Sequence, residues 1–547
     1  LLPKKETVMI GADAVVSALR KIGATHVFGI VSIHNMPIFD AISRDGTIQI
    51  IDCRHEMGAT HAADGYARAT GKTGIAIAST GPGTTNTVTG LYEAQYASSP
   101  VLLITGQAET GFYGKAQGYV HEAEAQLPML RTVTRRAESV RIAARIEDTI
   151  LEVANDISSG RPSSGAVEIP IDLQYAEVSE SGQGFNPVNP EMAGDLDRAV
   201  SLITGSRKRI IIAGGGVTYG GASDALTRLA EKLQAPVFMT PNGRGAITED
   251  HSLAIGNLYQ SRKLHGDMMD ADLTIAIGTR FQVGVGGSGA ALIPPGKLLH
   301  IDIDASVVDL VHKSEASLIG DAAEILPAID AAMNPEPCSP EFVEKIQTAN
   351  RELRQKLRQR LGSDYEGILD AIREHAPRDT LIVRDTTVPA YNFVNQLLPI
   401  YGPRTFIGPN SAAIGPGLPL AVGAAAGTGK KTVVIHGDGG FMFHATELAT
   451  AAQYQLPMVI CVFNDGGYGV LRGLQSQQFE GRYSDTDLGV VDFAGLAESM
   501  GVTGVGVQTL TEFTTAFEAA MDREGPTLLN IDMRKLIPMQ GSILPAQ

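Results

Sequence analysis

The sequence predicts an α/β protein built from three units, each with a central, mostly parallel β-sheet flanked by helices. Short runs rich in β-branched residues alternate with amphipathic stretches along the whole chain, which is typical of parallel strands joined by helical crossovers. The length of 547 residues corresponds to about three or four domains of ordinary size.

The expected strands are apolar runs spread over all three thirds of the chain: 74–78, 101–105, 209–213, 273–278, 381–384, 432–436 and 458–464. Most of these runs lead directly into Gly, Asn or Asp. Sheets of this class bind ligands beyond the carboxyl ends of their strands. We therefore expect binding residues in the turns that follow the strands.

Two connectors divide the chain. Residues 177–191 are rich in Ser, Gly, Asn and Pro, and residues 334–340 read NPEPCSP. The resulting domain limits are 7–176, 190–334 and 361–547. A charged segment with a helical pattern, 341–360, leads into the last unit.

The composition excludes several classes of protein. With 44% hydrophobic and 19% charged residues the chain is an ordinary globular protein, and a net charge of −16 makes nucleic acid and anionic membranes poor partners. The three cysteines are widely spaced, so neither a disulfide framework nor a thiolate zinc site is expected. The first ten residues fit no signal peptide, and we expect a cytoplasmic enzyme.

A glycine-rich turn follows the first strand of the middle third, in the sequence IIIAGGGVTYGG. Backbone amides at such a turn can bind a nucleotide phosphate. The spacing is not GxGxxG, however, and close packing between a strand and a helix explains the glycines equally well.

The last third contains two acidic turns, GDGGFMF and FNDGGYG, each directly after an apolar strand. Asp438 and Asp465 are 27 residues apart, so one βα unit would place both carboxylates at adjacent strand ends. Oxygen ligands of this kind suit octahedral Mg²⁺. The glycines Gly437, Gly439 and Gly440 would let the backbone approach a diphosphate.

This pair of turns resembles the metal–diphosphate motif of the thiamine-diphosphate-dependent enzymes. The resemblance implies that Asp438 and Asp465 bind the metal through their side chains and Gly467 through its carbonyl, with Tyr468 at the cofactor. Members of the family usually carry Asn at the position of Asp465, so this chain adds one negative charge without losing an oxygen ligand.

The first third contains Glu56 at the start of a small-residue helix, followed by the turn STGPGTTN. As a first-turn acid Glu56 would also be favoured by the helix dipole alone. Together, the Glu, GYA and GPG segments resemble the pyrimidine-binding domain of the acetolactate synthase and benzoylformate decarboxylase branch. The resemblance implies that Glu56 bonds a pyrimidine nitrogen and so promotes formation of the cofactor carbanion, with Gly81, Pro82 and Asn86 beside the cofactor.

The segment NSAAIGPGLP in the last third resembles the family loop that bends the cofactor. By this resemblance Ile414 would be the wedge between the two rings, and the Ala412 carbonyl and Ile414 amide would bind the pyrimidine edge. Thr386 and Thr387, at the end of an upstream strand, are weaker candidates for diphosphate contacts.

The resemblance to acetolactate synthase spans nearly the whole chain but departs at the substrate side. This chain has Leu474 where the synthase has a tryptophan, and His121 where it has a glutamine. The GIVSIHN segment is closer to 2-hydroxyacyl-CoA lyases, and it places His34 where benzaldehyde lyase has its pocket histidine. We therefore expect His34 and His121 to be catalytic proton carriers, with hydrogen-bonded loop histidines as the alternative.

The main functional hypothesis is a thiamine-diphosphate- and Mg²⁺-dependent carbon–carbon lyase or carboligase acting on a 2-oxo acid, with or without acyloin formation. One alternative is a lyase for 2-hydroxyacyl-CoA or acyloin substrates. A remote one is a non-catalytic regulator that binds a nucleotide. The resemblance also implies a homodimer or homotetramer with active sites at the interface, and a central domain of the FAD-binding type, with or without FAD or another nucleotide.

Overall fold

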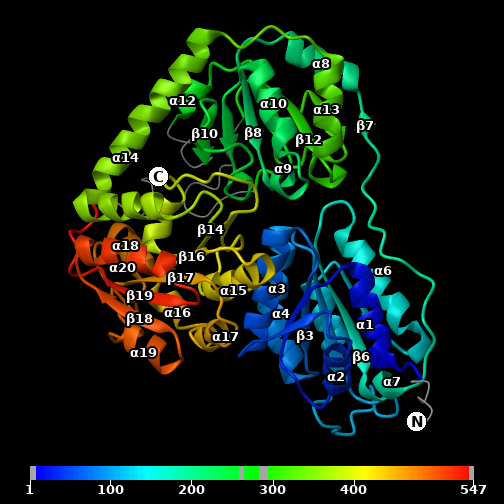
Figure 1. The fold of residues 1–547 in the computed structure, drawn as a ribbon. Helices are drawn as coiled ribbons and strands as arrows, with labels where there is room; N and C mark the ends of the chain where they lie inside the picture. Colours follow the sequence, from blue (N-terminus) through cyan, green and yellow to red (C-terminus); the bar gives the residue numbers. More distant parts are fainter. Residues whose placement is uncertain (1–7, 258–263, 283–293, 541–547) are drawn as a thin grey trace.

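The computed structural model describes residues 8–257, 264–282 and 294–540. Three β-sheets follow one another along the chain, and each is flanked by helices (Figure 1). This confirms the predicted fold class. The predicted strand runs all form strands, although several ends differ by one or two residues. The domain limits 7–176, 190–334 and 361–547 remain a proposal.

The N-terminal sheet has six parallel strands in the order β2-β1-β3-β4-β6-β5. Its strands are β1 (His26–Gly29), β2 (Gln49–Asp52), β3 (Gly74–Ala78), β4 (Val101–Gln107), β5 (Arg136–Ser139) and β6 (Ser164–Pro170). Its helices are α1 (Gly11–Ile22), α2 (Met36–Asp45), α3 (Glu56–Thr70), α4 (Pro82–Ala97), α5 (Gln126–Thr132), α6 (Ile146–Ser158) and α7 (Ile171–Tyr175).

Within the described residues, the central sheet has seven strands in the order β10-β9-β8-β11-β12-β13-β7, and of these only the short edge strand β7 is antiparallel to its neighbour. The strands are β7 (Ala193–Gly194), β8 (Arg209–Ala213), β9 (Val237–Met239), β10 (Ala254–Asn257), β11 (Leu273–Ile277), β12 (Lys297–Asp302) and β13 (Ala316–Ile319). The helices are α8 (Leu196–Thr204), α9 (Gly215–Tyr219), α10 (Ser223–Leu233), α12 (His265–Met268) and α13 (Ala322–Ala332).

The C-terminal sheet has six parallel strands in the order β15-β14-β16-β17-β19-β18. The strands are β14 (Leu381–Arg384), β15 (Phe406–Ile407), β16 (Thr432–Gly437), β17 (Met458–Asn464), β18 (Thr503–Val507) and β19 (Thr527–Asp532). The helices are α14 (Pro340–His375), α15 (Gly417–Thr428), α16 (Asp438–Phe441), α17 (Glu447–Gln453), α18 (Gly469–Gln478), α19 (Phe493–Ser499) and α20 (Leu510–Asp522). The long helix α14 is kinked at Gly362, where φ is 76°.

Helices α3 and α15 join the N-terminal and C-terminal units (Figure 1). Both are built from small residues, which lets their backbones approach closely. A methyl group placed on Gly65 would lie 1.9 Å from the carbonyl oxygen of Leu420, and one on Gly423 would lie 1.7 Å from that of Ala62. Buried residues of both units consequently form one continuous core.

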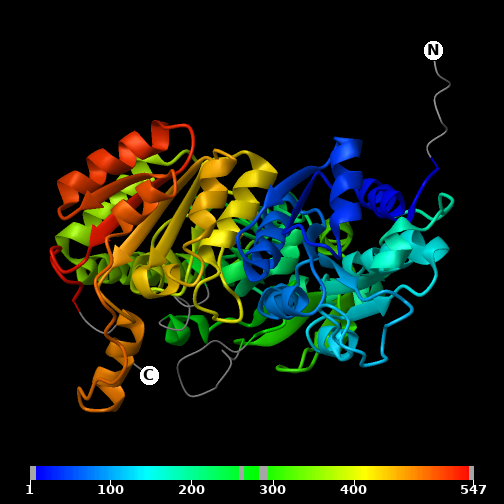
Figure 2. The ribbon, with the colours of Figure 1, turned by 90° about the horizontal axis from the view of Figure 1, so that it is seen from below.

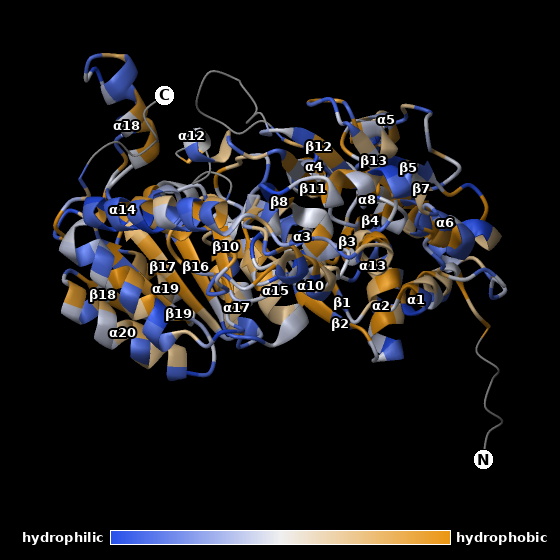
Figure 3. Cartoon of the chain, turned by 90° about the horizontal axis from the view of Figure 1, so that it is seen from above, coloured by the Kyte–Doolittle hydropathy of each residue, from blue (hydrophilic) through white to orange (hydrophobic). Residues whose placement is uncertain are grey.

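The hydropathy colouring of Figure 3 shows apolar strands β16 and β17 enclosed by helices with polar outer faces. Helix α18 stands away from the body of its unit in Figures 2 and 3, and none of its residues is buried. Within the described ranges, we find no helix with the length and apolar character needed to cross a membrane.

Candidate active site

The two predicted metal ligands lie at the ends of neighbouring strands. Strands β16 and β17 pair in parallel with Gly437 opposite Phe463, and Asp438 and Asp465 follow closely. Oδ2 of Asp438 and Oδ1 of Asp465 both accept a hydrogen bond from the amide of Gly467, at 2.8 and 3.1 Å. The fold thus brings two carboxylates to a single amide.

Little positive charge lies near the carboxylates of Asp438 and Asp465. Burial raises the pKa of Asp438. Burial, reinforced by the nearby Asp438 carboxylate, raises the pKa of Asp465 to about 6, although Arg472 Nη2 lies 3.3 Å from its Oδ1. A buried and a half-buried carboxylate that repel each other suit a divalent cation, which would remove the repulsion.

The donor set further limits the kind of cation. Among the described residues no group of three or more His, Cys, Asp and Glu side chains is arranged to hold a metal. A cation at Asp438 and Asp465 would therefore complete its shell with backbone, phosphate or water oxygens, as Mg²⁺ usually does. The amide of Gly467 contacts both carboxylates here, and ligation by its carbonyl remains a prediction.

The predicted cofactor loop 410–419 is held beside this pair by Asp385, a buried residue that directly follows β14. Its carboxylate accepts hydrogen bonds from the amides of Gly415, at 3.0 Å, and Gly417, at 2.7 Å. The hydroxyl of Thr386 donates to the carbonyl of Ala413 at 2.9 Å. The polar contacts of Asp385 thus fix the loop that carries the predicted wedge.

The remaining candidates of the C-terminal unit surround the same point. A methyl group on Gly440 would lie 2.9 Å from Ile414, one on Gly437 would lie 2.6 Å from the hydroxyl of Thr387, and one on Gly439 would lie 2.7 Å from the ring of Tyr468. Ala412 adopts a left-handed backbone conformation, with φ at 63°. Residues from four separate segments therefore form one cradle beside Asp438.

The predicted acid Glu56 opens α3 in the N-terminal unit. His55 caps the helix by accepting the amide of Met57, and the side chain of Asn86 donates to Oε2 of Glu56 at 3.0 Å. Glu56 is partly exposed, so one face of its carboxylate remains accessible. Asn86 orients this carboxylate, which is what a hydrogen-bonding acid requires.

The turn at Gly81 and Pro82 starts α4 next to Glu56. Gly81 has φ at 59°, and a Cβ atom there would lie 2.6 Å from the carbonyl oxygen of His121. Only glycine fits this position without strain, because the left-handed conformation and the close approach both exclude a side chain.

The two predicted histidines lie together near this turn. The ring centroids of His34 and His121 are 5.2 Å apart. His34 is buried, and its Nδ1 has no hydrogen-bond partner among the described residues. Burial, and then the charge of His121, lowers the pKa of His34, so its ring is neutral at pH 7. His121 is exposed and has φ at 61°.

A buried glutamine fixes the same turn, and no sequence motif pointed to it. Oε1 of Gln126 accepts the amide of Gly81 and the hydroxyl of Thr80, both at 2.9 Å. Its Nε2 donates to the carbonyl of Gly106 and to Glu168, both at 3.1 Å. All four hydrogen-bonding positions of this side chain are therefore used.

Glu56 and the carboxylate pair belong to different parts of one chain. The side-chain hydrogen bond of Glu56 stays within the N-terminal unit. The large cavity that reaches Thr386 and Ala412 has no contribution from Glu56, Asp438 or Asp465. Within the described residues, no side-chain hydrogen bond joins Glu56 to Asp438 or Asp465, and we call the surroundings of each a half-site.

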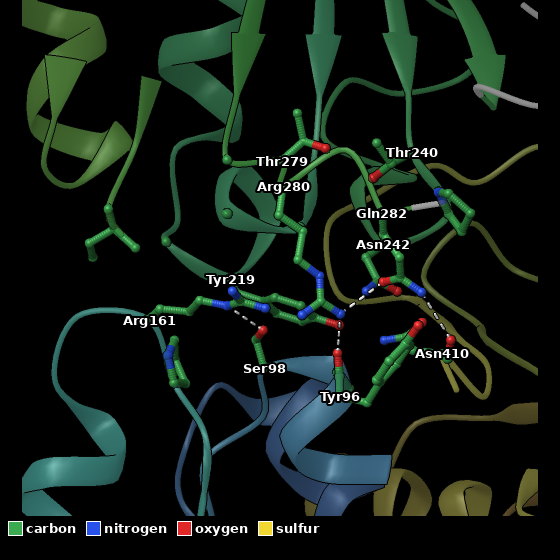
Figure 4. A pocket seen from close by; sticks show the side chains of 18 of the residues that line it. Tyr96, Ser98, Arg161, Tyr219, Thr240, Asn242, Thr279, Arg280, Gln282 and Asn410 are labelled. Atoms are coloured by element: carbon green, nitrogen blue, oxygen red, sulfur yellow. Dashed lines mark hydrogen bonds between the residues drawn. The ribbon is translucent and has the colours of Figure 1, made fainter. Parts of the chain in front are cut away.

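This cavity, of about 830 Å³, lies where the three units meet (Figure 4). Arg280 projects into it and donates to the carbonyl of Tyr96 at 2.7 Å, while Gln282 donates to the carbonyl of Asn410 at 3.3 Å. Arg161 donates to Ser98 at 2.8 Å. The predicted glycine turn of the middle third contributes Gly215 and Gly216, and Leu474 of α18 also lines the cavity.

Comparison with known proteins identifies the family. Three thiamine pyrophosphate enzyme models match the chain: the N-terminal TPP binding domain at residues 9–129, the central domain at 196–329 and the C-terminal TPP binding domain at 390–531.

Similar proteins carry the name acetolactate synthase. The chain is 31% identical to the probable acetolactate synthase large subunit of Methanocaldococcus jannaschii, over 97% of this chain and 93% of that protein. It is 31% identical to the acetolactate synthase isozyme 2 large subunit of Escherichia coli K12, over 96% of each chain. The acetolactate synthase of Arthrospira platensis is also 31% identical, over 95% of this chain and 93% of that protein.

These matches confirm the family predicted from the motifs, and with it the predicted class of enzyme. The chain belongs to the thiamine pyrophosphate enzyme family and is an acetolactate synthase-like enzyme that depends on thiamine diphosphate.

Proposed function

We propose that this enzyme decarboxylates a 2-oxo acid and either releases an aldehyde or joins the remaining fragment to a second carbonyl compound. The observation that carries the proposal is the convergence of Asp438 and Asp465 on one amide, beside the cradle that contains Ile414. When bound, thiamine diphosphate supplies the carbanion and the electron sink for this chemistry.

The residues of the C-terminal unit would hold the cofactor. Asp438, Asp465 and the Gly467 carbonyl would bind Mg²⁺, and Gly437, Gly439, Gly440, Thr386, Thr387 and Tyr468 would surround the diphosphate. Ala412 and Ile414 would contact the pyrimidine edge. The support for this assignment is that one cradle gathers these residues from separate segments.

The residues of the N-terminal unit would move protons. Glu56, oriented by Asn86, would hydrogen-bond the pyrimidine ring, with Gly81 and Pro82 forming the adjacent wall. His34 and His121 would exchange a proton with the substrate. His34 is suited to this role because its Nδ1 has no hydrogen-bond partner among the described residues and can therefore accept or donate a proton.

The test is the variant Glu56→Gln, with Glu324→Gln as control. Both residues are first-turn acids of a helix, so both variants lose the same favourable contact with the helix dipole. We expect CO₂ release from 2-oxo acids to fall by about 10²-fold or more in Glu56→Gln and to be unchanged in the control. Wild-type turnover by Glu56→Gln would refute the proposed role.

The substrate can be identified with a panel of pyruvate, benzoylformate and acyloins, scored for CO₂ and for carbonyl products. Consumption of a 2-oxo acid with release of CO₂ supports the proposal. Cleavage of acyloins or 2-hydroxyacyl-CoA compounds without CO₂ would instead assign the alternative lyase activity.

We also propose that the cavity between the three units binds a nucleotide such as FAD. Its volume of about 830 Å³ and the three arginines in its wall, Arg161, Arg280 and Arg384, suit an elongated anionic ligand. Mass spectrometry of the small molecules released on denaturation would identify it, and recovery of thiamine diphosphate alone would contradict this part of the proposal.

Finally, we propose a homodimer or homotetramer in which Glu56 of one chain completes the site of another. Exposed apolar side chains flank both half-sites: Val31, Ile33 and Val120 in the N-terminal unit, and Met442, Phe443 and Leu488 in the C-terminal unit. Contact between these surfaces would bury them. A cytoplasmic location remains a prediction.

A further inference from the structure

A buried carboxylate of the N-terminal unit crosses the domain boundary to the cofactor loop of the C-terminal unit. Glu93 lies on α4 and has no exposed surface. Its Oε1 accepts the amide of Asn410 at 2.6 Å, and its Oε2 accepts both the amide of Ser411, at 3.0 Å, and the hydroxyl of Ser411, at 2.5 Å. Neither its sequence context nor any cofactor motif pointed to this residue.

An arginine from α3 holds Glu93 in place. Nη2 of Arg68 lies 2.8 Å from Glu93 and 2.5 Å from Asp64, and Nη1 donates to the carbonyl of Gly408 at 2.7 Å. Burial by itself would raise the pKa of Glu93, but Arg68 and the Asn410 amide outweigh burial and hold that pKa below its ordinary value. Glu93 is therefore a charged, fully hydrogen-bonded group in the interior.

The loop is consequently fixed at two points. Glu93 and Arg68 hold residues 408–411 from the neighbouring unit, and Asp385 holds Gly415 and Gly417 from within the C-terminal unit. The stretch between these points contains Ala412, which has a left-handed conformation, and Ile414. Two fixed ends leave this stretch little freedom to change its conformation.

We propose that Glu93 is a positioning residue for the pyrimidine side of the cofactor site. It acts through the backbone of Asn410 and Ser411, and it sets the orientation of the Ala412 carbonyl and the Ile414 amide before the cofactor binds. This inference rests on the proposed function, because it takes 412–414 to be the pyrimidine-binding stretch. Preorganisation of this kind lowers the entropy cost of binding.

The test is the variant Glu93→Gln, with Glu249→Gln as matched control. Glutamine has the shape of glutamate but one acceptor oxygen fewer, so its NH₂ group would face a backbone N–H of the loop. Glu249 is also a buried carboxylate, 2.7 Å from Arg244, and it makes no contact with the loop. Both variants remove one charge from a buried ion pair, and only one of them affects residues 408–411.

For Glu93→Gln we expect the dissociation constant of thiamine diphosphate, measured by calorimetry at fixed Mg²⁺, to rise about ten- to hundredfold. The cofactor KM should rise in parallel, while kcat at saturating cofactor changes much less. Hydrogen exchange of the segment 405–416 should accelerate in the cofactor-free protein. Glu249→Gln should lower the unfolding temperature and leave all three quantities near their wild-type values.

A milder variant covers the case in which Glu93→Gln does not fold. Ser411→Ala removes only the hydroxyl contact with Glu93, and we expect the cofactor KM to rise a few-fold with kcat preserved. The inference would be overturned if either variant folds and shows the cofactor affinity and the hydrogen-exchange rates of the wild-type protein. Absence of thiamine diphosphate binding by the wild-type protein would refute the proposed function instead, and hydrogen exchange would still show whether Glu93 orders the loop.

Discussion

At the scale of single residues, the most unusual feature of the site is the second carboxylate of the metal motif. The resemblance leads one to expect Asn at position 465, and the chain has Asp. Burial, followed by the repulsion from Asp438, raises the pKa of Asp465 to about 6. The proton on Asp465 and the metal therefore compete for the same oxygen near neutral pH.

This competition predicts a pH dependence of cofactor binding. The pKa of Asp465 is higher in the folded protein than in the unfolded chain. Protonated Asp465 therefore stabilises the metal-free protein at low pH, and this stabilisation is lost as the pH rises through about 6. Metal affinity increases over the same range, because the carboxylate oxygen loses its proton. Lowering the pH from 7 to 5 should weaken the binding of Mg²⁺ with thiamine diphosphate in both proteins. The loss of affinity should be about tenfold larger in wild type than in Asp465→Asn. Calorimetric titrations at both pH values measure this, and parallel profiles would contradict it.

At the scale of elements, helices α3 and α4 serve both half-sites of the chain. Their N-terminal ends carry Glu56 and Asn86, and Arg68 and Glu93 lie further along. Close packing of α3 against α15 joins the N-terminal and C-terminal units through one shared core. The position of the acid and the position of the cofactor loop thus depend on the same pair of helices.

We predict that Gly423→Ala disrupts this arrangement. The added methyl group would lie 1.7 Å from the carbonyl of Ala62, so the helices must separate, which costs about 1–3 kcal/mol of unfolding free energy or more. Gly266→Ala in α12 is the control, because no atom of the described residues lies within 4 Å of its added methyl group. The stability of the control should stay within about 1 kcal/mol of wild type. Urea unfolding compares the two, and equal stabilities would contradict the prediction.

At the scale of the whole molecule, one chain holds the acid and the metal ligands in separate half-sites. If sites form between chains, two different inactive variants can complement each other. A mixed dimer of Glu56→Gln and Asp438→Asn has one site with both changes and one site with neither.

Co-expression of these two variants should therefore restore about a quarter of wild-type activity, since half of the dimers are mixed and each mixed dimer has one intact site. Each variant alone should be inactive. Turnover of the identified 2-oxo acid by the co-purified mixture is the measurement. If the mixture is as inactive as its components, the sites lie within single chains and the proposed assembly is wrong.

The sequence by itself determined the α/β class, the strands that end in polar turns, and the two motifs around Glu56 and around Asp438 and Asp465. These features are local: a strand, its turn and the next helix occupy about thirty consecutive residues, so their spacing is visible in the chain. The role of the chain as a thiamine-diphosphate-dependent enzyme was predictable for the same reason.

Only the tertiary structure revealed that Glu93 and Asp385 fix the cofactor loop and that Gln126 fixes the Gly81 turn. The cavity between the three units was also visible only there. Glu93 and Ser411 are more than three hundred positions apart in the chain, and a buried glutamate on a helix has no sequence pattern that distinguishes it from an exposed one. Contacts of this kind depend on how helices α3, α4 and α15 pack, because packing decides which distant backbone groups a buried charge can reach.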